Sequence, residues 1–319
     1  MQKYLGKGVQ ILKTAPELGL HALYKPPGSV SHRDTISGSA SQIRCLIDAP
    51  YNMRNESFIT HDGSIHLLHR LDRETSGVIL VATDPLVAAG VREAFRTRMI
   101  KKIYKALSFG KHTDFKYLPT LWTDQYIAPG YNGCNTPLVF PEVQSQRETS
   151  PRHASKNTDI VLKCKSPALV GRVGSNVQYS KSKQSQAKES PFRHAETMVL
   201  SAESKWLGLQ HYAGAQRVPA TLFTLSPQTG FTHQLRLVLQ ARGHPIVGDN
   251  IYGNFALQKH LHSGRPNRMF LHAQSIEAHF WAGGQQHSFA ASTEYVDHNN
   301  GASFLQGWKV SLDSILLQE

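Results

Sequence analysis

The sequence is poor in cysteine, with only Cys45, Cys134 and Cys164 among 319 residues. They lie far apart, are odd in number and form no C-x-x-C pair, which argues against a disulfide framework and a cysteine zinc site. This sparse usage fits a reducing compartment. The sequence also lacks any apolar run near the roughly 20 residues that a membrane-spanning helix needs. We therefore expect neither a membrane nor a metal ion among the partners of the protein.

Acidic residues are scarce as well. The chain has 23 Asp and Glu against 35 Lys and Arg, which gives a net charge of +12 and an isoelectric point near 9.6. This balance favours a polyanionic partner, most simply nucleic acid, although a merely soluble basic protein can have the same balance. Hydrophobic residues make up 40% of the chain, enough for a core, and the length allows one large domain or two smaller ones.

The start of the chain carries Lys3, Lys7 and Lys13 and no acid before Glu17. Such a basic start is compatible with an organelle-targeting peptide, but it lacks arginine and a clear amphipathic pattern. We therefore expect a cytoplasmic protein, with a mitochondrion or another organelle as the alternative. We also expect the chain to act as a monomer.

Strand and helix patterns follow one another without a regular β-α-β rhythm. In the clearest helix, Thr83 or Asp84 can cap the first turn, Pro85 suits that turn, and apolar residues recur at helical spacing up to residue 95. A second helix is predicted over 232–241. We expect strands at 21–24, 78–82, 100–107, 195–207, 219–225 and beyond 268, and short helical pieces at 42–47 and around Trp308. The pattern favours an α+β fold with a largely antiparallel sheet.

The composition changes between residues 142 and 194, where serine, glutamine, lysine and arginine dominate. Because this segment has little to bury, we predict a polar, basic and largely disordered insertion. Its short apolar pieces at 160–162 and 168–170 could instead form an added strand pair, and the sequence does not decide between the two. We expect residues 1–319 to form a single domain, with a core of about 20–310 that this insertion interrupts.

One short stretch, residues 69–77 (HRLDRETSG), stands out from the rest. Its acid, Asp72, is flanked by arginines and is followed by small residues that we interpret as turn formers rather than reactants. The apolar run at 78–82 then predicts a buried strand. A carboxylate in such a place is unusual unless its charge has a function.

Three stretches, in this order, resemble the RluA-type family of RNA pseudouridine synthases. Residues 25–28 (KPPG) resemble the N-K-P-x-G turn of that family, and residues 69–77 match its H-R-L-D-x-x-T-S-G motif. Residues 229–236 (TGFTHQLR) and 243–249 (GHPIVGD) resemble its T-G-R-[ST]-H-Q-[IL]-R and G-H-P-I-x-G-D segments. Tyr104 lies where the family carries the tyrosine of a K-x-Y-x-A strand. Three motifs in the family order are far more specific than one.

The resemblance extends from about residue 20 to 285. It implies an α+β catalytic domain, with a mixed, mainly antiparallel sheet, flanking helices and a central RNA-binding cleft. It leaves no residues for the small extra N-terminal RNA-binding domain that some members carry. Phe231 stands where the family usually has arginine, which could weaken a phosphate contact, and Tyr24 replaces an asparagine.

Pseudouridine formation breaks the glycosidic bond of uridine, turns the uracil and rejoins it through carbon 5, so no cofactor is needed. The step requires an ionised carboxylate beside the ribose, as a nucleophile or as the base for a sugar proton. The resemblance assigns this role to Asp72. Arg236 is expected to favour its ionised form, although the two could form a purely structural ion pair. Tyr104 is expected to stack on the uracil and to help the carbon-5 proton leave, unless it is only a core residue.

Uracil inside stacked RNA is out of reach, so the target nucleotide must be flipped into the pocket. Arg70 is placed to fill the vacated stack or to bind a phosphate, and an ordinary solvated arginine is an equal alternative. We also expect Arg73, His233 and Gln234 to bind RNA. His233 and His69 are interpreted as hydrogen-bonding core histidines rather than as bases or metal ligands.

The sequence therefore predicts an RNA pseudouridine synthase, an isomerase that needs no cofactor and acts on transfer or ribosomal RNA. It does not specify the RNA class or the uridine. The alternative is a catalytically inactive RNA-binding or ribosome-assembly protein that retains the fold. Phe231 and the long insertion motivate that alternative, whereas the intact Asp72, Tyr104 and Arg236 argue against it.

Overall fold

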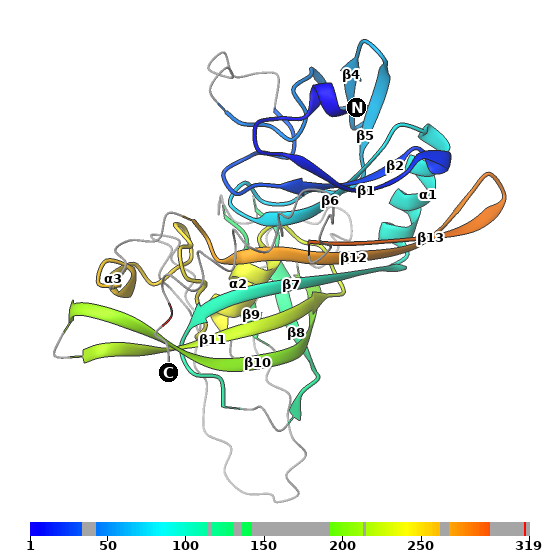
Figure 1. Cartoon of the computed structure of the whole chain (residues 1–319). Helices are drawn as coiled ribbons and strands as arrows, with labels where there is room; N and C mark the ends of the chain where they lie inside the picture. Colours follow the sequence, from blue (N-terminus) through cyan, green and yellow to red (C-terminus); the bar gives the residue numbers. More distant parts are fainter. Residues whose placement is uncertain are drawn as a thin grey trace, which may run out of the picture.

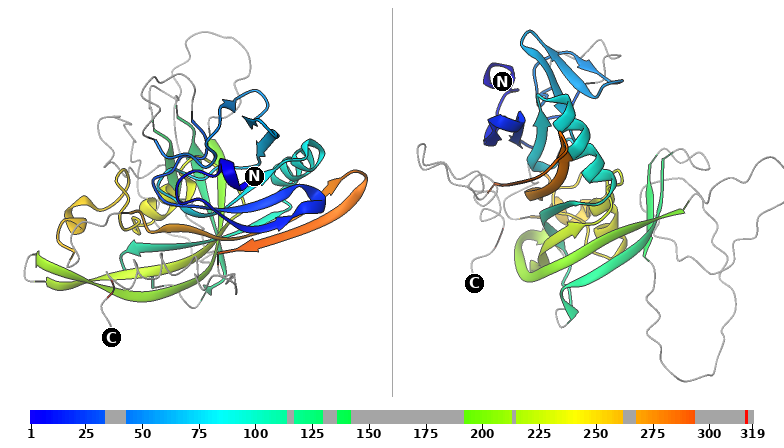
Figure 2. Two further views of the ribbon diagram at one scale, coloured as in Figure 1. Left: turned by 45° about the horizontal axis from the view of Figure 1, so that its top comes forward. Right: turned by 90° about the vertical axis from the view of Figure 1, so that its right-hand side faces the viewer.

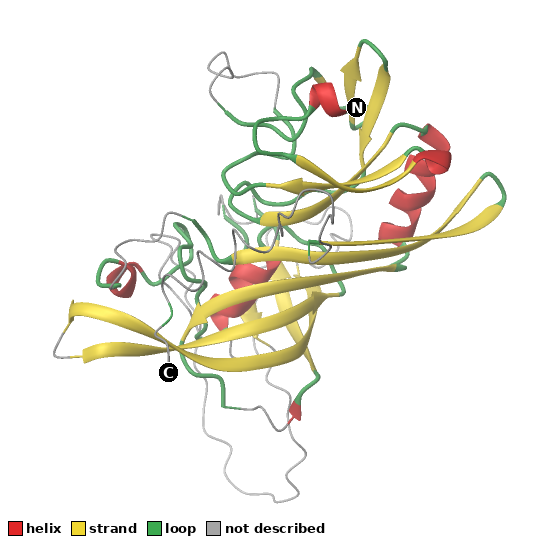
Figure 3. Ribbon diagram, in the orientation of Figure 1, coloured by secondary structure: helices red, strands yellow, loops and turns green. Residues whose placement is uncertain are grey.

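The computed structural model describes residues 1–33, 43–113, 117–129, 136–141, 192–212, 215–261, 268–293 and Leu316. These residues form a 13-stranded sheet with few helices (Figures 1 and 3). Along the sheet the strand order is β3-β4-β5-β6-β12-β7-β11-β10-β8-β9, while β2 pairs with both β1 and β6 and β13 pairs with β12. The N-terminal strands therefore lie at one end of the molecule and β8 to β11 at the other (Figure 2).

The elements have the following bounds. The strands are β1 (Gln10–Ala15), β2 (Leu20–Lys25), β3 (Tyr51–Asn52), β4 (Ser57–Thr60), β5 (Gly63–Leu67), β6 (Ser76–Ala82), β7 (Ile100–Phe109), β8 (Thr120–Ile127), β9 (Leu138–Pro141), β10 (Phe192–Tyr212), β11 (Ala215–Pro227), β12 (Leu271–Ala282) and β13 (Gln285–Ser292). The helices are α1 (Pro85–Arg96), α2 (Gln234–Ala241) and α3 (Phe255–Gln258), with short 3₁₀ turns at Gln2–Tyr4 and Pro16–Leu18.

The sheet is mixed but mainly antiparallel. Among the described strands every pair runs antiparallel except β6 with β12, which pair in parallel at Ser76–His272 and Gly77–Ala273. At this contact a Cβ on Gly77, which has a φ of 121°, would lie 2.1 Å from the carbonyl oxygen of Ala273. Only glycine allows the two strands to approach this closely. The α+β, mainly antiparallel fold that the sequence predicts is confirmed.

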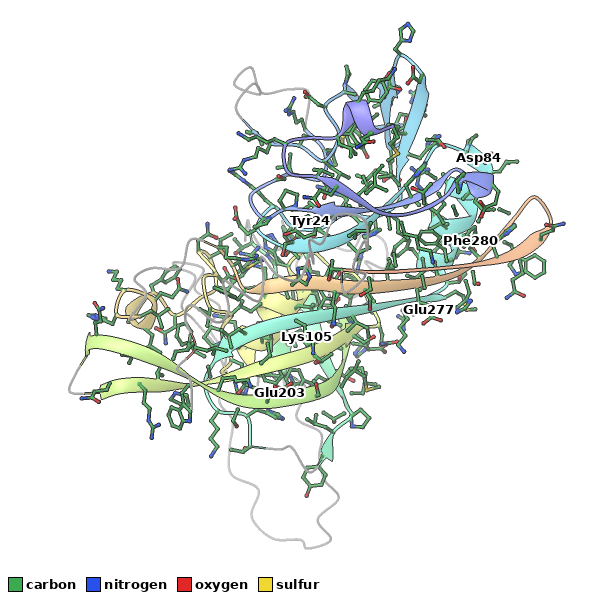
Figure 4. All side chains as sticks on the ribbon, in the orientation of Figure 1. Tyr24, Asp84, Lys105, Glu203, Glu277 and Phe280 are labelled. Atoms are coloured by element: carbon green, nitrogen blue, oxygen red, sulfur yellow. The ribbon has the colours of Figure 1, made fainter. Side chains whose placement is uncertain are left out.

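Helix α1 covers one part of the sheet. Its cap is Asp84 (labelled in Figure 4), whose Oδ1 accepts the N–H groups of Leu86 and Val87 at 2.7 and 3.0 Å. The apolar face that the spacing predicted, including Val87 and Val91, is buried against β2, β6 and β12. The capped, amphipathic helix thus forms as its sequence indicates.

Helix α2 covers the other part of the sheet and brings the second motif region to the centre. Leu235, Val238 and Leu239 are buried with residues of β7, β8, β10 and β11, as the predicted helix requires. The helix begins after His233, whose φ of 58° turns the chain sharply. Its buried face therefore anchors the residues on its first two turns against the sheet.

Three expectations differ from the described structure or lie outside it. Residues 43–47 form no helix, because Cys45 bridges to Val30 and Ile47 bridges to Leu5 in extended pairing. The expected insertion reaches too far at its end, since β10 already begins at Phe192 and pairs with β8. The rest of the insertion, both of its apolar pieces and the helical piece around Trp308 lie outside the described residues.

Within the described part of the chain, no helix is long and apolar enough to cross a membrane.

Candidate active site

The loop that carries Asp72 connects β5 to β6 and is held by contacts on both sides of the acid. Before the acid, Ser31 Oγ donates to the carbonyl of Leu71 at 2.9 Å and accepts the Leu71 N–H at 3.1 Å. After it, the N–H of Thr75 donates to the Asp72 carbonyl at 3.1 Å and closes a turn. The side chain of Asp72 remains 25% exposed. The loop therefore presents one carboxylate from a rigid backbone.

The turn at residues 25–28 fastens the same loop from a distant part of the sequence. Lys25 is fully buried, and its ammonium donates to the carbonyls of Ser29 at 2.6 Å and of Arg73 at 3.0 Å. The N–H of Gly28 donates to the same Arg73 carbonyl at 2.9 Å. Burial lowers the pKa of Lys25 to about 7. The sequence motif did not reveal this role, because the two partners are 48 positions apart.

Arg236 on α2 connects Asp72 to a second acid. Its Nε and Nη2 donate to both carboxylate oxygens of Asp249, at 2.7 and 2.9 Å. Its Nη1 donates to Asp72 Oδ2 at a longer distance of 3.4 Å. Arg236 is thus brought to Asp72, as the sequence predicts, but its stronger partner is Asp249. The fork of Arg236 fixes where its third nitrogen can point.

Asp249 is a site residue that the sequence reasoning missed, although it ends the quoted GHPIVGD segment. Its side chain is completely buried, and its Oδ1 also accepts the N–H groups of Ile251 and Tyr252. Burial raises the pKa of Asp249, but the hydrogen bonds and charge of Arg236 outweigh this effect and lower the pKa below its usual range. Asp249 therefore stays ionised and keeps Arg236 oriented.

Tyr104 projects from β7 and packs between two apolar clusters. Burial raises the pKa of its phenol above the ordinary value, and the nearby negative charge of Asp72 raises it further. Tyr104 and Asp72 are thus close enough to interact electrostatically, and the phenol keeps its proton. The structure brings together the three residues expected to carry the chemistry.

His233 lies beside the same carboxylate. Its Nε2 is 4.0 Å from Asp72 Oδ1, and its Nδ1 forms a 2.9 Å hydrogen bond with the hydroxyl of Tyr252. Burial lowers the pKa of His233, and Arg236 lowers it further, while the two acids oppose them. The guanidinium of Arg236 lies 4.9 Å above the Tyr252 ring. These contacts join the first turn of α2 to the loop after Asp249.

Comparison with known proteins identifies the family of the chain. The model of a family described as RNA pseudouridylate synthase matches residues 19–241. The chain belongs to the RNA pseudouridylate synthase family. Two ribosomal large subunit pseudouridine synthases C are similar to it: that of Haemophilus ducreyi is 29% identical over 66% of this chain and 47% of its own length, and that of Vibrio vulnificus is 27% identical over 81% and 58%.

The chain therefore spans about half the length of the curated relatives it matches. Two solved structures have the same fold. Human RNA Pseudouridylate Synthase Domain Containing 1 matches with a TM-score of 0.52 and 19% identity over 98% of this chain and 91% of that one. Human RNA Pseudouridylate Synthase Domain Containing 4 matches with a TM-score of 0.53 and 18% identity over 97% and 94%. The resemblance of the sequence motifs to this family is thus confirmed.

Two departures from the family motifs have structural partners in this pseudouridylate synthase family member. Phe231, which replaces the usual arginine, stacks on Tyr126 with ring centroids 4.5 Å apart and an angle of 13° between the planes. Tyr24, which replaces asparagine, forms a hydrogen bond with Arg268. Each replacement side chain therefore has a partner within the protein next to the motif.

The residues expected to bind RNA occupy different environments. Arg70 and Arg73 are exposed beside Asp72, and Arg73 Nε also donates to the carbonyl of Gly28 at 3.3 Å. Gln234 is buried, and its amide is used within the protein. Its oxygen accepts from Thr229 Oγ1 and the Phe231 N–H, and its nitrogen donates to the Glu196 carbonyl and Thr197 Oγ1. This geometry contradicts a direct RNA contact by Gln234, whose amide instead holds the loop before α2.

His69 and Ser76 have internal partners as well. Leu80 donates its N–H to His69 Nε2 at 3.0 Å, and burial lowers the pKa of His69 to about 3. The prediction of a hydrogen-bonding core histidine is therefore confirmed for His69. Ser76 Oγ bonds to His272 and to Arg268, and Ser76 is fully buried, as expected for a residue that shapes the turn.

Among the described residues, no group of three or more His, Cys, Asp or Glu side chains is arranged to hold a metal ion.

Proposed function

We propose that the protein converts uridine to pseudouridine in RNA, with Asp72 as the catalytic carboxylate. The observation that supports this proposal best is the arrangement around Asp72. Its backbone is anchored on both sides by Ser31 and Lys25, its side chain is partly exposed, and a buried guanidinium lies 3.4 Å away. Arg236 already has a bidentate partner in Asp249, so it does not depend on Asp72 for its charge balance, and the partly exposed carboxylate of Asp72 is open to a ligand.

The chemistry uses groups of this chain alone. The carboxylate of Asp72 either attacks carbon 1′ or removes a proton of the ribose, and the bond between carbon 1′ and nitrogen 1 breaks. The freed uracil turns and its carbon 5 bonds to carbon 1′; this breaks the bond between carbon 1′ and Asp72 in the first route, and in the second route Asp72 returns its proton to the ribose. Carbon 5 then loses its proton while nitrogen 1 gains one. Arg236, fixed by Asp249, balances the charge of Asp72 without competing for the substrate.

Tyr104 acts as a flat platform for the uracil in this proposal. A phenolate would be required for Tyr104 to take the carbon-5 proton directly, and its raised pKa disfavours that form. The ring can nevertheless stack on a flipped base, an interaction worth about 1–3 kcal/mol. Arg70, exposed next to Asp72, is suited to occupy the place that the flipped base leaves in the RNA.

We infer that the substrate is ribosomal RNA of the large subunit, with transfer RNA as the alternative. The similarity to proteins named ribosomal large subunit pseudouridine synthase C supports this choice. A monomer is sufficient, because one chain supplies every residue of the proposed site. We also propose that a single catalytic domain is built around the described core, with the segment after Pro141 as an insertion between β9 and β10.

The test is to map pseudouridines at nucleotide resolution in RNA from cells with and without the gene. Purified protein is then added to RNA from the cells that lack it. We expect at least one uridine of large-subunit ribosomal RNA to be converted only when the protein is present. If the purified protein binds this RNA but converts no uridine, the non-catalytic RNA-binding protein is the correct interpretation.

A further inference from the structure

The last step of the reaction needs a group that accepts the proton of carbon 5. Tyr104 does not fit this role, because burial and the charge of Asp72 raise the pKa of its phenol, which therefore keeps its own proton. Lys25 is buried and donates to three backbone carbonyls, and Arg236 remains a cation. None of these three side chains can therefore take a proton beside Asp72.

His233 lies next to Asp72 with an imidazole that a ligand can reach. Its Nε2 is 4.0 Å from Asp72 Oδ1, and each of the two side chains is 25% exposed. The other ring nitrogen, Nδ1, forms a hydrogen bond of 2.9 Å with the hydroxyl of Tyr252. Because Tyr252 is buried, this bond holds the inner side of the ring and leaves Nε2 on the side of the carboxylate. A uridine bound at Asp72 can therefore contact Nε2 as well.

The backbone of His233 is held in an uncommon conformation. Its φ of 58° lies in the left-handed region, which few residues other than glycine adopt. Residues of this kind are frequent at active sites, where the surrounding structure holds a side chain in a required position. Here helix α2 begins directly after His233, and Arg236 on this helix bonds to Asp72. One helix therefore holds both the imidazole and the carboxylate in place.

The charges around His233 change during the reaction in the order that proton removal requires. Burial lowers the pKa of His233 and outweighs the carboxylates of Asp72 and Asp249, which raise it, while Arg236 lowers it further. The imidazole is therefore neutral at neutral pH and able to accept a proton. While Asp72 is bound to carbon 1′ or protonated, its negative charge is absent. The charge returns when carbon 5 joins carbon 1′, and it then favours an imidazolium beside it.

We propose that Nε2 of the neutral His233 removes the proton from carbon 5 once the new carbon–carbon bond has formed. At that stage carbon 5 is bonded directly to carbon 1′, which lies next to Asp72 in both routes. The electrons of the broken bond form the double bond between carbons 5 and 6, the imidazole becomes imidazolium, and nitrogen 1 gains a proton from water. The imidazolium then returns its proton to water, so protons and charge balance. In this role Nδ1 carries the hydrogen of the neutral ring and donates it to the Tyr252 oxygen.

The inference rests on the proposed function, since it concerns a step of the same reaction. The experiment follows single turnovers on a fragment of large-subunit ribosomal RNA whose target uridine carries hydrogen or deuterium on carbon 5. His233→Asn is the first variant, because asparagine tolerates the left-handed region and its amide can still bond to Tyr252. Since it has no basic nitrogen, we expect pseudouridine to form about 100-fold more slowly. Loss of the carbon-5 proton then limits the rate, so deuterium should slow this variant more than it slows the wild type.

Three measurements separate this role from a structural one. The RNA affinity and the melting temperature of His233→Asn should stay close to those of the wild type. His233→Gln, which also lacks a basic nitrogen, gives the same comparison if the asparagine variant does not fold. His279→Gln is the matched control and should react like the wild type. His279 is an exposed histidine on β12 whose Nε2 lies 3.3 Å from Glu277 (labelled in Figure 4).

Two results would overturn the proposal. One is a rate for the His233 variants within about threefold of the wild type. The other is a slower rate with an unchanged effect of deuterium, which would assign the proton to water and a structural role to the ring. A wild-type protein that converts no uridine would refute the proposed function and this inference with it. That result differs from an active wild type with unaffected variants, which refutes this inference alone.

Discussion

Arg236 lies between two acids, Asp249 and Asp72, and we predict that only Asp249 contributes strongly to stability. Asp249→Asn should destabilise the protein strongly, whereas Asp72→Asn should leave its stability nearly unchanged. Asn at position 249 keeps an oxygen for the N–H groups of Ile251 and Tyr252 but removes the negative charge. The side chains of Arg236 and Asp249 are 3% and 0% exposed, and that of Asp72 is 25% exposed.

The magnitudes follow from these environments. Breaking a buried ion pair by removal of one partner costs about 3–5 kcal/mol, because the remaining charge is left uncompensated. The Asp72 pair is longer, at 3.4 Å, and is partly open to water, so its loss should cost about 1 kcal/mol or less. Arg236 keeps its fork to Asp249 in the Asp72 variant and therefore remains balanced.

The assay is urea unfolding of the two single variants and of the double variant Arg236→Met/Asp249→Asn, with equal m-values as a condition for the comparison. The double variant should regain part of the stability lost in Asp249→Asn, because it removes the unpaired cation. If Asp72→Asn is as destabilising as Asp249→Asn, then Asp72 is a structural acid and the assignment of separate roles is wrong.

Three further predictions follow from the site and the sheet. Tyr104→Phe should lower the rate of pseudouridine formation less than tenfold and Tyr104→Ala about 10- to 100-fold, because only the alanine loses the stacking ring; a loss of 100-fold or more in Tyr104→Phe would instead assign proton transfer to the hydroxyl. Buried His272 has a pKa of about 3, lowered by burial from 6.5, so the unfolded chain binds more protons between these values. His272 should therefore contribute about 2 kcal/mol to the fall in unfolding free energy between pH 6.5 and 4.5, beside the contribution of His69, whose pKa is also about 3. The fall should be smaller by this amount in His272→Gln, and an unchanged fall would contradict this cause. Pro141 and Phe192 flank β8 from its two sides, so a linker of about ten Gly and Ser residues can replace 142–191, and loss of the cooperative melt would show that the segment belongs to the core.

The fold and the centre of the site could be predicted because their determinants are local. The apolar run at 78–82 in β6, the capped α1 and the apolar face of α2 each follow from short-range patterns. The motif around Asp72 has a fixed sequence of residues, so its loop was recognisable before any geometry was known. The parallel pairing of β6 with β12 was not predictable in this way, because the two strands are far apart in the chain.

The parts that the sequence did not reveal depend on tertiary contacts. Residues 43–47 were expected to form a short helix, but Cys45 and Ile47 bridge to Val30 and Leu5, pairings that depend on distant parts of the chain. Gln234 was expected at the RNA surface, yet it is buried where α2 begins and bonds to Glu196 and Thr197. Arg236 bonds to Asp249 through two of its nitrogens and to Asp72 through only one. No sequence pattern specifies that choice.

The most direct test of the central claim compares the wild-type protein with Asp72→Asn on the same ribosomal RNA, with product and RNA affinity measured together. The carboxylate is proposed to act on the ribose, and the contacts to RNA phosphates are proposed to come from other residues. The variant should therefore form no pseudouridine while its dissociation constant for the RNA stays within about threefold of the wild type. Pseudouridine formed by Asp72→Asn at a rate close to that of the wild type would contradict the role assigned to this acid.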